Sequence, residues 1–314
     1  MMKTLDLIVP CYNEEAVLPL FYETVRQTLQ TLSGYRTTLI FVDDGSSDGT
    51  LRLLRDFAAK DSAVRYLSFS RNFGKEAAML AGLRASTGDL VGILDADLQH
   101  SPALLPPMLE AIEEGYDVAA AKRTDRAGEG KLKSRLSDAF YHAANRITEI
   151  EIDPGAQDFR VMKRKVADAI LSLSEHRRFT KGLFAFVGFK TKWFPHENAA
   201  RAAGKTKWNF KKLFAYALDG ICSYSDLPLK LPLYGGAALL VLSVLFALAL
   251  LIARLCGAAV PGLLGILFAV LFLAAWIQLS VGVLGVYLAR VYGESKNRPH
   301  YIVSESNLPQ GKKL

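Results

Sequence analysis

The sequence predicts an α/β domain built on a parallel sheet, followed by two membrane-spanning helices. Strand-like and helix-like stretches alternate through the first 230 residues, and two long uncharged stretches fill much of the last third. A strand, helix, strand rhythm predicts parallel strands joined by right-handed crossovers. We expect strands at residues 6–9, 38–42, 64–69, 90–94 and 117–121, with helices near 15–32, 48–60, 74–86 and 102–114.

The two uncharged stretches cover residues 231–253 and 255–289 and are separated only by Arg254. Each is long enough to cross a bilayer, which requires about 20 apolar residues. The sequence therefore predicts a domain over residues 1–230 and a transmembrane hairpin over 231–290. Its helices are expected at about 231–253 and 263–289, and residues 291–314 are expected to form a tail.

Basic residues place both ends of the hairpin on the cytoplasmic side of the cell's inner membrane. Lys211, Lys212 and Lys230 precede the first apolar stretch, basic residues follow the second, and Arg254 alone lies at the tip. Positively charged flanks favour the cytoplasm. The three scattered cysteines fit a reducing compartment and show no metal-binding spacing.

Polar residues follow three of the predicted strands at their carboxyl ends, where ligands of open α/β sheets bind. These segments are Pro10-Cys11-Tyr12-Asn13-Glu14, Asp43-Asp44-Gly45-Ser46 and Asp95-Ala96-Asp97. A plain turn also accounts for the second segment, because its residues are common turn formers. Three polar segments that converge at one edge of the sheet nevertheless indicate a site.

The pair Asp95 and Asp97 predicts a divalent cation. Residues two apart in an extended segment face the same side, and two neighbouring carboxylates need a cation to stay ionised. Hard oxygen ligands select Mg²⁺ or Mn²⁺, usually together with substrate phosphates, and Gln99 could add an oxygen. A nucleoside diphosphate fits such a site, and Asp43 and Asp44 could bind its base or ribose. No Gly-x-Gly-x-x-Gly follows the first strand, which disfavours a dinucleotide.

Five ordered motifs closely resemble the family 2 inverting glycosyltransferases of the GT-A fold. They are IVPCYNEE, FVDDGSSDGT, FSRNFGKEAAMLAGL, DADLQHSP and GAQDFRVM. Within that family the resemblance is to polyprenyl-phosphate glycosyltransferases, namely dolichol-phosphate mannose synthases and, more closely, bacterial bactoprenol glucosyltransferases. It implies transfer of a sugar from a nucleotide sugar, UDP-glucose first, to polyprenyl (undecaprenyl) phosphate. UDP-N-acetylglucosamine, UDP-galactose, aminoarabinose donors and GDP-mannose stay open as alternatives.

The resemblance also implies roles for individual residues. The metal would be held by Asp95, Asp97 and Gln99, and the catalytic acids would be Asp97 and Asp158, the latter as base or as positioning residue. His100 is expected to be an ordinary loop residue, and residues 71–75 could simply lead into a helix. The nucleotide-sugar pocket would be lined by Pro10, Tyr12, Asn13, Glu14, Asp43, Asp44, Lys75, Asp95 and Ala96.

Two basic segments lead into amphipathic stretches, at about 130–149 and 206–224. A basic face beside an apolar stripe is typical of helices that lie in the membrane interface, although a solvated charged face explains the pattern too. The net charge of +7 is concentrated there, which favours lipid phosphate over nucleic acid as the partner. We expect the acceptor phosphate to be bound by Arg123, Arg135, Arg160, Arg201 and Lys207.

Two other functions are weighed against this one. A processive polysaccharide synthase typically carries a Gln-x-x-Arg-Trp motif and more membrane helices, neither of which is found here. A non-catalytic, membrane-anchored binder or scaffold of a glycan pathway would tolerate loss of the acids, yet all are present. Small residues in the second apolar stretch, Ser280, Gly282 and Gly285, permit close helix contact and suggest a homo-oligomer.

Overall fold

The computed structural model describes residues 2–123, 153, 155–176, 178–196, 225, 227–256 and 263–309. The chain divides into two compact units. The first unit comprises Met1–Arg146, Ile150–Ala217 and Pro299–Leu314, and the second comprises Ile147–Glu149 and Leu218–Arg298. The predicted amphipathic stretches at 130–149 and 206–224 lie outside the described residues.

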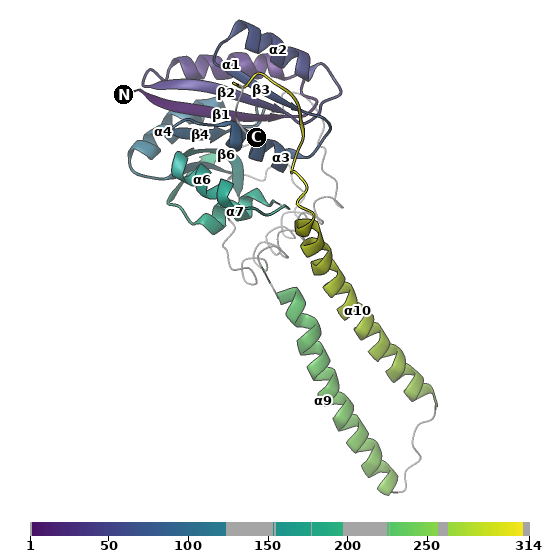
Figure 1. Ribbon diagram of the computed structural model, residues 1–314. Coiled ribbons are helices and arrows are strands. Elements are labelled where there is room, and N and C mark those ends of the chain that lie inside the picture. Colours follow the sequence, from purple (N-terminus) through teal and green to yellow (C-terminus); the bar gives the residue numbers. More distant parts are fainter. Residues whose placement is uncertain are drawn as a thin grey trace. The chain divides into compact units, whose positions relative to one another are not determined.

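An eight-stranded mixed sheet forms the centre of the first unit (Figure 1). Its strand order is β7-β5-β6-β4-β1-β2-β3-β8. Strands β1 to β4 are mutually parallel, whereas β6 runs antiparallel to both β4 and β5, and β8 runs antiparallel to β3. The strands are β1 Lys3–Cys11, β2 Tyr35–Asp43, β3 Val64–Phe69, β4 Leu90–Ile93, β5 Val118–Arg123, β6 Ala156–Lys163, β7 Thr191–His196 and β8 Val303–Ser306.

Helices cover the sheet and bury its apolar residues. Leu7 and Phe41 of the strands share one core cluster with Phe21 of α1, Leu54 of α2 and Met108 of α4. Helix α3 packs closely on β1, because a Cβ on its Gly82 would overlap a side chain of that strand. The helices of this unit are α1 Leu18–Gln30, α2 Thr50–Lys60, α3 Lys75–Ala85, the 3-10 turn η1 Pro102–Leu104, α4 Leu105–Glu113, α6 Arg164–Ser172 and α7 Thr180–Val187.

The five predicted strands and four predicted helices are all confirmed, and β1 to β5 run in one direction as expected, but two further antiparallel strands make the whole sheet mixed rather than parallel. Strand β6 enters between β4 and β5 in the opposite direction. Strand β8, which belongs to the expected tail, completes the edge beside β3. Hydrophobic periodicity reports that a segment is a strand, but it carries no information on the neighbour or the direction of that strand.

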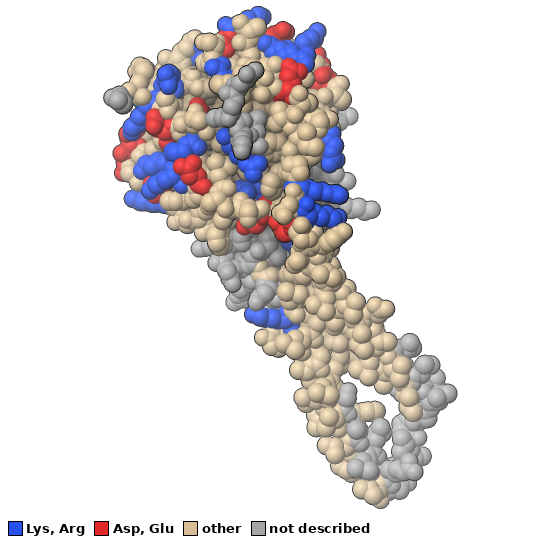
Figure 2. All heavy atoms as spheres, in the orientation of Figure 1, with Lys and Arg blue, Asp and Glu red and all other residues tan. Residues whose placement is uncertain are grey.

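Two long apolar helices make up the described part of the second unit, α9 Leu227–Leu255 and α10 Leu263–Ser295. Both contain windows long and apolar enough to cross a membrane, at Leu229–Phe246 and Phe272–Ser295, and neither window is buried. Lys, Arg, Asp and Glu gather on the first unit, whereas these helices present almost only uncharged atoms (Figure 2). The helices touch where Gly235 faces the ring of Trp276.

We expect Gly45→Ala to destabilise the first unit strongly. Gly45 has φ +65°, and an added Cβ would overlap the backbone of Arg71. Left-handed strain and overpacking together should cost about 2–4 kcal/mol of the free energy of unfolding. The matched control is Gly34→Ala, since Gly34 has nothing within 4 Å of an added Cβ. Thermal unfolding of the purified variants in detergent measures the difference, and equal midpoints would contradict the expectation.

Candidate active site

The loops that follow β1 and β2 are fastened to each other at the carboxyl ends of these paired strands. The amide of Asn13 donates to Ser46 Oγ at 2.9 Å, and the amide of Ser47 donates to Asn13 Oδ1 at 2.8 Å. The amide of Glu14 donates to Thr50 Oγ1 at 2.9 Å. Two of the three polar segments singled out in the sequence therefore form one connected rim.

Asp43 and Asp44 are buried and bind groups of the protein itself. Asp43 accepts from Ser68 Oγ at 2.7 Å and from the amide of Ser46 at 3.1 Å. Asp44 accepts from the amides of Phe73 and Gly74, at 2.6 and 2.9 Å for the shortest contacts. Burial raises the pKa of Asp44 to about 6, against the lowering effect of these amides. Both acids organise the rim, and their contact with a nucleoside stays a prediction.

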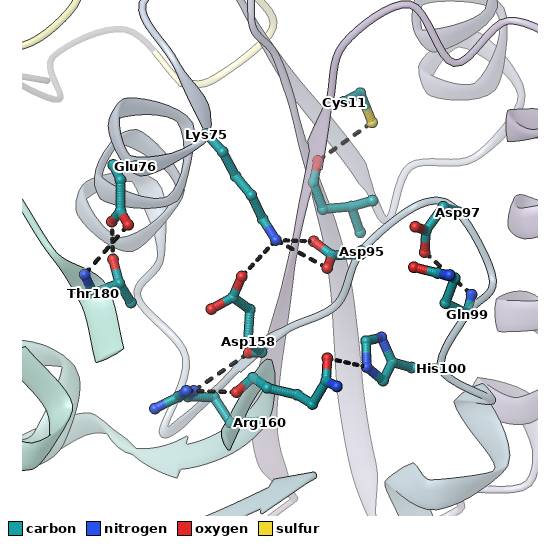
Figure 3. Close-up of polar contacts among 12 residues, drawn as sticks. Cys11, Lys75, Glu76, Asp95, Asp97, Gln99, His100, Asp158, Arg160 and Thr180 are labelled. Atoms are coloured by element: carbon teal, nitrogen blue, oxygen red, sulfur yellow. Dashed lines mark hydrogen bonds and ion pairs between the residues drawn. The ribbon is translucent and has the colours of Figure 1, made fainter. Parts of the chain in front are cut away.

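Lys75, the first residue of α3, lies between two acids from different strand ends (Figure 3). Its Nζ is 2.7 Å from Asp95 Oδ1 and 2.5 Å from Asp158 Oδ2. Partial removal from water opposes the charged form of Lys75, but the carboxylates of Asp158 and Asp95 outweigh this effect and raise the pKa of this lysine above its usual range. Lys75 therefore joins two acids, Asp95 and Asp158, that were also named from the sequence.

The antiparallel strand β6 brings Asp158 to this place. Ile93, the last residue of β4, pairs with Arg160, so Asp158 lies beside the start of the segment that carries Asp95. Burial favours the neutral acid, yet the charges of Lys75 and Lys181 hold the pKa of Asp158 well below its usual range. Asp158 is thus an ionised carboxylate at neutral pH, which favours charge pairing over proton transfer as its role.

Asp97 does not lie in an extended segment, so the expectation that Asp95 and Asp97 share one face of a strand end is wrong. Strand β4 ends at Ile93, and Asp97 belongs to a turn in which Leu98 has φ +55°. Asp97 Oδ1 accepts from the amide of Gln99 at 3.1 Å. Figure 3 shows Asp95 turned toward Lys75 and Asp97 beside Gln99.

The donor set still suits a hard divalent cation. Among the described residues, no group of three or more His, Cys, Asp and Glu side chains is arranged to hold a metal ion. Asp95 and Asp97 nevertheless place two carboxylates in one short segment, with Gln99 two residues further along the chain. Mg²⁺ is commonly bound by one or two carboxylates with substrate phosphates completing its shell.

Two histidines fasten the turn that carries Asp97. His196, at the end of β7, places Nε2 2.9 Å from the carbonyl oxygen of Gln99. His100 is buried, and its Nε2 lies 2.8 Å from Oε1 of Gln157 in β6. Burial lowers the pKa of His100, so the ring is neutral at pH 7. His100 is therefore more than the ordinary loop residue that the sequence favours, because it joins the Asp97 turn to the strand that carries Asp158.

Arg160, which we expected to bind the acceptor phosphate, is buried. It is 2% exposed, and its guanidinium donates to the carbonyl oxygens of Gln157 and Asp158, at 2.6 and 3.3 Å. The ring of Phe184 covers it at 3.7 Å. This geometry favours a bracing role for Arg160 over contact with an acceptor phosphate. Arg123 ends β5 and is partly exposed, whereas Arg135, Arg201 and Lys207 lie outside the described residues.

The rest of the predicted pocket lies on the same strand ends. Pro10 pairs with Val42 near the end of β1, Tyr12 and Glu14 follow in the rim, and Ala96 is buried between Asp95 and Asp97. Sequence reasoning missed His196 and the pairing of Lys75 with two acids. A signal for Lys75 existed, since a lysine directly after a glycine at a helix start is well placed to reach beyond the strand ends.

A Rossmann-like mixed sheet with carboxylates and a lysine at its strand ends fits the GT-A fold of glycosyltransferases, and sequence comparison agrees. The model of glycosyl transferase family 2 matches residues 6–171. The chain belongs to this family and is a glycosyltransferase.

Relatives match along nearly the whole chain. CsbB of Bacillus subtilis (strain 168), which is named as a glycosyltransferase, is 42% identical to this chain. The match covers 97% of this chain and 92% of CsbB. The prophage bactoprenol glucosyl transferase homolog of Escherichia coli (strain K12) is 40% identical, over 95% of this chain and 98% of its own. The SfII prophage-derived bactoprenol glucosyl transferase of Shigella flexneri is also 40% identical, over 96% and 98%.

Proposed function

We propose that this enzyme transfers a sugar, with inversion, from a nucleoside diphosphate donor to polyprenyl phosphate, and that the donor is UDP-glucose. The observation that carries the proposal is the similarity to bactoprenol glucosyl transferases, which extends through both units of the chain. The site supports it as well, because paired carboxylates and a lysine at the strand ends suit a diphosphate leaving group.

A divalent cation, Mg²⁺ or Mn²⁺, would be held by Asp95 and Asp97, with Gln99 beside them. When bound, such an ion neutralises charge that develops on a departing diphosphate. Lys75 contributes a positive charge to the same region, and Asp158 holds that charge in place at 2.5 Å. These two residues would orient the donor sugar and its diphosphate before the acceptor attacks.

The acceptor needs little help from a base. A phosphate monoester has a second pKa of about 6, so the lipid phosphate is mostly dianionic at neutral pH. Its oxygen would attack the anomeric carbon from the face opposite the nucleoside diphosphate, form the new C–O bond and release the diphosphate. Asp158 is kept ionised by Lys75, and we assign it to positioning rather than to proton removal.

We further propose that α9 and α10 span the inner membrane as a hairpin, with the catalytic unit and both termini in the cytoplasm. The two unburied apolar windows support spanning, and the basic residues that flank the hairpin support this orientation. A membrane-spanning hairpin would keep the catalytic unit at the surface where a polyprenyl phosphate exposes its headgroup.

A donor screen tests the proposed function. Membranes that contain the full-length enzyme are incubated with undecaprenyl phosphate and one radiolabelled donor at a time, and label is followed into the lipid phase. The donors are UDP-glucose, UDP-N-acetylglucosamine, UDP-galactose and GDP-mannose. We expect label from UDP-glucose to enter a lipid product in which the sugar is joined to the phosphate. Transfer from another donor would correct the sugar, and no lipid product with any donor would overturn the proposal.

We expect Arg135→Ala and Arg201→Ala to weaken acceptor use while donor use stays nearly unchanged. Arginine grips phosphate with parallel charged hydrogen bonds, and losing one such contact should cost about 1.5–3 kcal/mol, or roughly 10- to 150-fold. The measurement is the KM and kcat/KM for undecaprenyl phosphate beside the KM for the donor. Arg160→Lys serves as a contrasting variant. Because Arg160 is buried, this change should lower the thermal stability of the protein rather than alter the KM for the acceptor. Weakened donor binding with normal acceptor kinetics would instead place Arg135 and Arg201 in the donor pocket.

A further inference from the structure

The chain returns to the catalytic sheet soon after the second apolar helix. Helix α10 ends at Ser295, and residues 299–307, which we name the carboxyl-terminal strap, run along the edge of β3. Ser306 and Glu305 pair with Leu67 and Ser68 in an antiparallel register. The strap therefore belongs structurally to the catalytic unit, although the hairpin separates it from the rest of that unit in sequence.

The far end of the strap is anchored away from the candidate active site. Glu305 accepts from Arg55 of α2 at 2.5 and 2.9 Å and from the hydroxyl of Tyr66 at 2.6 Å. The amide of Tyr66 donates to Oδ1 of Asn307 at 2.7 Å. These contacts join the strap to α2 and to the first half of β3.

The near end of the strap contacts the point at which β3 passes into the next loop. Tyr301 is 6% exposed, and its ring stacks on Phe69, the last residue of β3, with centroids 4.9 Å apart and planes 12° apart. The carbonyl oxygen of Ile302 accepts from the amide of Ser70 at 2.9 Å. The pairing of β3 with β8 shifts register between Ser68 and Phe69. The contacts of Tyr301 and Ile302 with Phe69 and Ser70, which we name the clasp, are therefore separate from the regular strand pairing.

Residues 70–75, which we name the Lys75 loop, run from this clasp to the lysine. Asp44 holds the loop from one side through the amides of Phe73 and Gly74. The ring of Phe73 meets the edge of Phe69 at 5.8 Å, so the stack Tyr301–Phe69 continues into the loop. Beyond it, Glu76 accepts from the amide and hydroxyl of Thr180, which fixes the start of α3.

The position of Lys75 depends on this loop. Its Nζ meets two carboxylates from two different strand ends, so small shifts of the α3 start change both distances. Misplacement of a reacting or charge-bearing group by about 1 Å costs on the order of 100-fold in rate. Gly74 adopts φ +101°, a conformation that only glycine takes readily, so the loop has an unusual path that its neighbours must hold.

We propose that Tyr301 is a positioning residue of the active site, which acts through Phe69, Phe73 and the Lys75 loop on the placement of Lys75. This proposal rests on the function proposed above for the site. An edge strand that merely covers β3 would affect stability alone. A positioning residue also changes the kinetics of the donor, because Lys75 lies among the acids that face it.

The test compares full-length Tyr301→Leu, Tyr301→Phe and Glu305→Gln in detergent micelles with UDP-glucose and undecaprenyl phosphate. Tyr301→Leu keeps apolar bulk but loses the ring stack, and it should lower kcat/KM for the donor about 10- to 100-fold. The acceptor KM should not change. Tyr301→Phe keeps the ring, so its kcat/KM for the donor should equal that of the wild type. Glu305→Gln loosens the far anchor and should lower the midpoint of thermal unfolding without a change in donor kinetics.

Normal donor kinetics in Tyr301→Leu, or an equal loss in Glu305→Gln, would overturn the positioning role. If Tyr301→Leu does not yield folded enzyme, hydrogen exchange of the wild type decides instead: the loop amides of Phe73 and Gly74 should open together with the amide of Ser70, which Ile302 of the strap holds, and independent opening overturns the proposal. These outcomes can be distinguished from failure of the proposed function. In that case the wild type itself would give no lipid product with any donor.

Discussion

Asp97→Asn is expected to abolish sugar transfer while the protein stays folded. Asparagine has the same shape and keeps an Oδ1 acceptor for the amide of Gln99, which lies 3.1 Å from this oxygen in the wild type. The turn should therefore survive, but the negative charge that a divalent cation needs is lost. Removing one preorganised electrostatic contribution of this kind costs about 100- to 1000-fold in kcat. Initial rates of lipid-linked product formation at saturating substrates measure the loss.

The control for this variant is Asp56→Asn, which makes the same chemical change at an exposed position of α2. Its kcat and thermal midpoint should equal those of the wild type. Metal-dependent binding of UDP, measured by calorimetry, should disappear in Asp97→Asn and persist in Asp56→Asn. Full turnover by Asp97→Asn, or by the wild type in excess chelator, would show that Asp97 holds no essential metal.

Lys75→Met is expected to have an effect of similar size, about 100- to 1000-fold in kcat. Methionine replaces the apolar stem of lysine but removes the charge that lies within 2.7 Å of both Asp95 and Asp158. Two carboxylates without an intervening cation repel, and one of them shifts toward its neutral form. The donor diphosphate also loses a positive partner. Because the three side chains are partly exposed to solvent, the thermal midpoint should change little.

The pH dependence of Lys75→Met adds a second measurement. In the wild type the nearby charges hold the pKa of Asp158 well below its usual range, so protonation of Asp158 does not limit activity in mild acid. Loss of Lys75 should raise that pKa, but because Asp158 acts by holding Lys75, protonation of Asp158 in this variant should cost little further activity, and the residual kcat should stay nearly level as pH decreases through the new value. Lys60→Met, at an exposed position of α2, is the matched control. Unchanged donor kinetics in Lys75→Met would remove Lys75 from the site.

A double-mutant cycle with Asp158→Asn separates the two partners. If Asp158 acts mainly by holding Lys75, then Lys75→Met should cost little further activity in the Asp158→Asn background, and the two effects should not add. Additive losses would indicate that Asp158 has a role of its own, such as proton removal from the acceptor. The cycle thus tests the positioning role that the short contact between these residues suggests.

Local sequence patterns determined much of this protein. Apolar runs bounded by polar residues identified strands β1 to β5, and helical spacing identified the helices between them, because both signals depend on near neighbours in the chain. The two long uncharged stretches predicted α9 and α10 for the same reason. The acids at three strand ends could be placed at one edge of the sheet, since parallel neighbouring strands present their carboxyl ends together.

Tertiary structure alone decided that Asp158 joins Asp95 at this edge, with Lys75 between them. Asp158 reaches Asp95 because β6 enters the sheet backwards between β4 and β5, and strand direction is set by long-range pairing rather than by local pattern. The strap joins β3 from a distant part of the chain, for the same reason. Asp97 lies outside the expected extended path because its side chain bonds the amide of Gln99, and His196 from β7 holds that turn. Contacts between distant segments depend on the packing of the whole sheet, which no single stretch of sequence encodes.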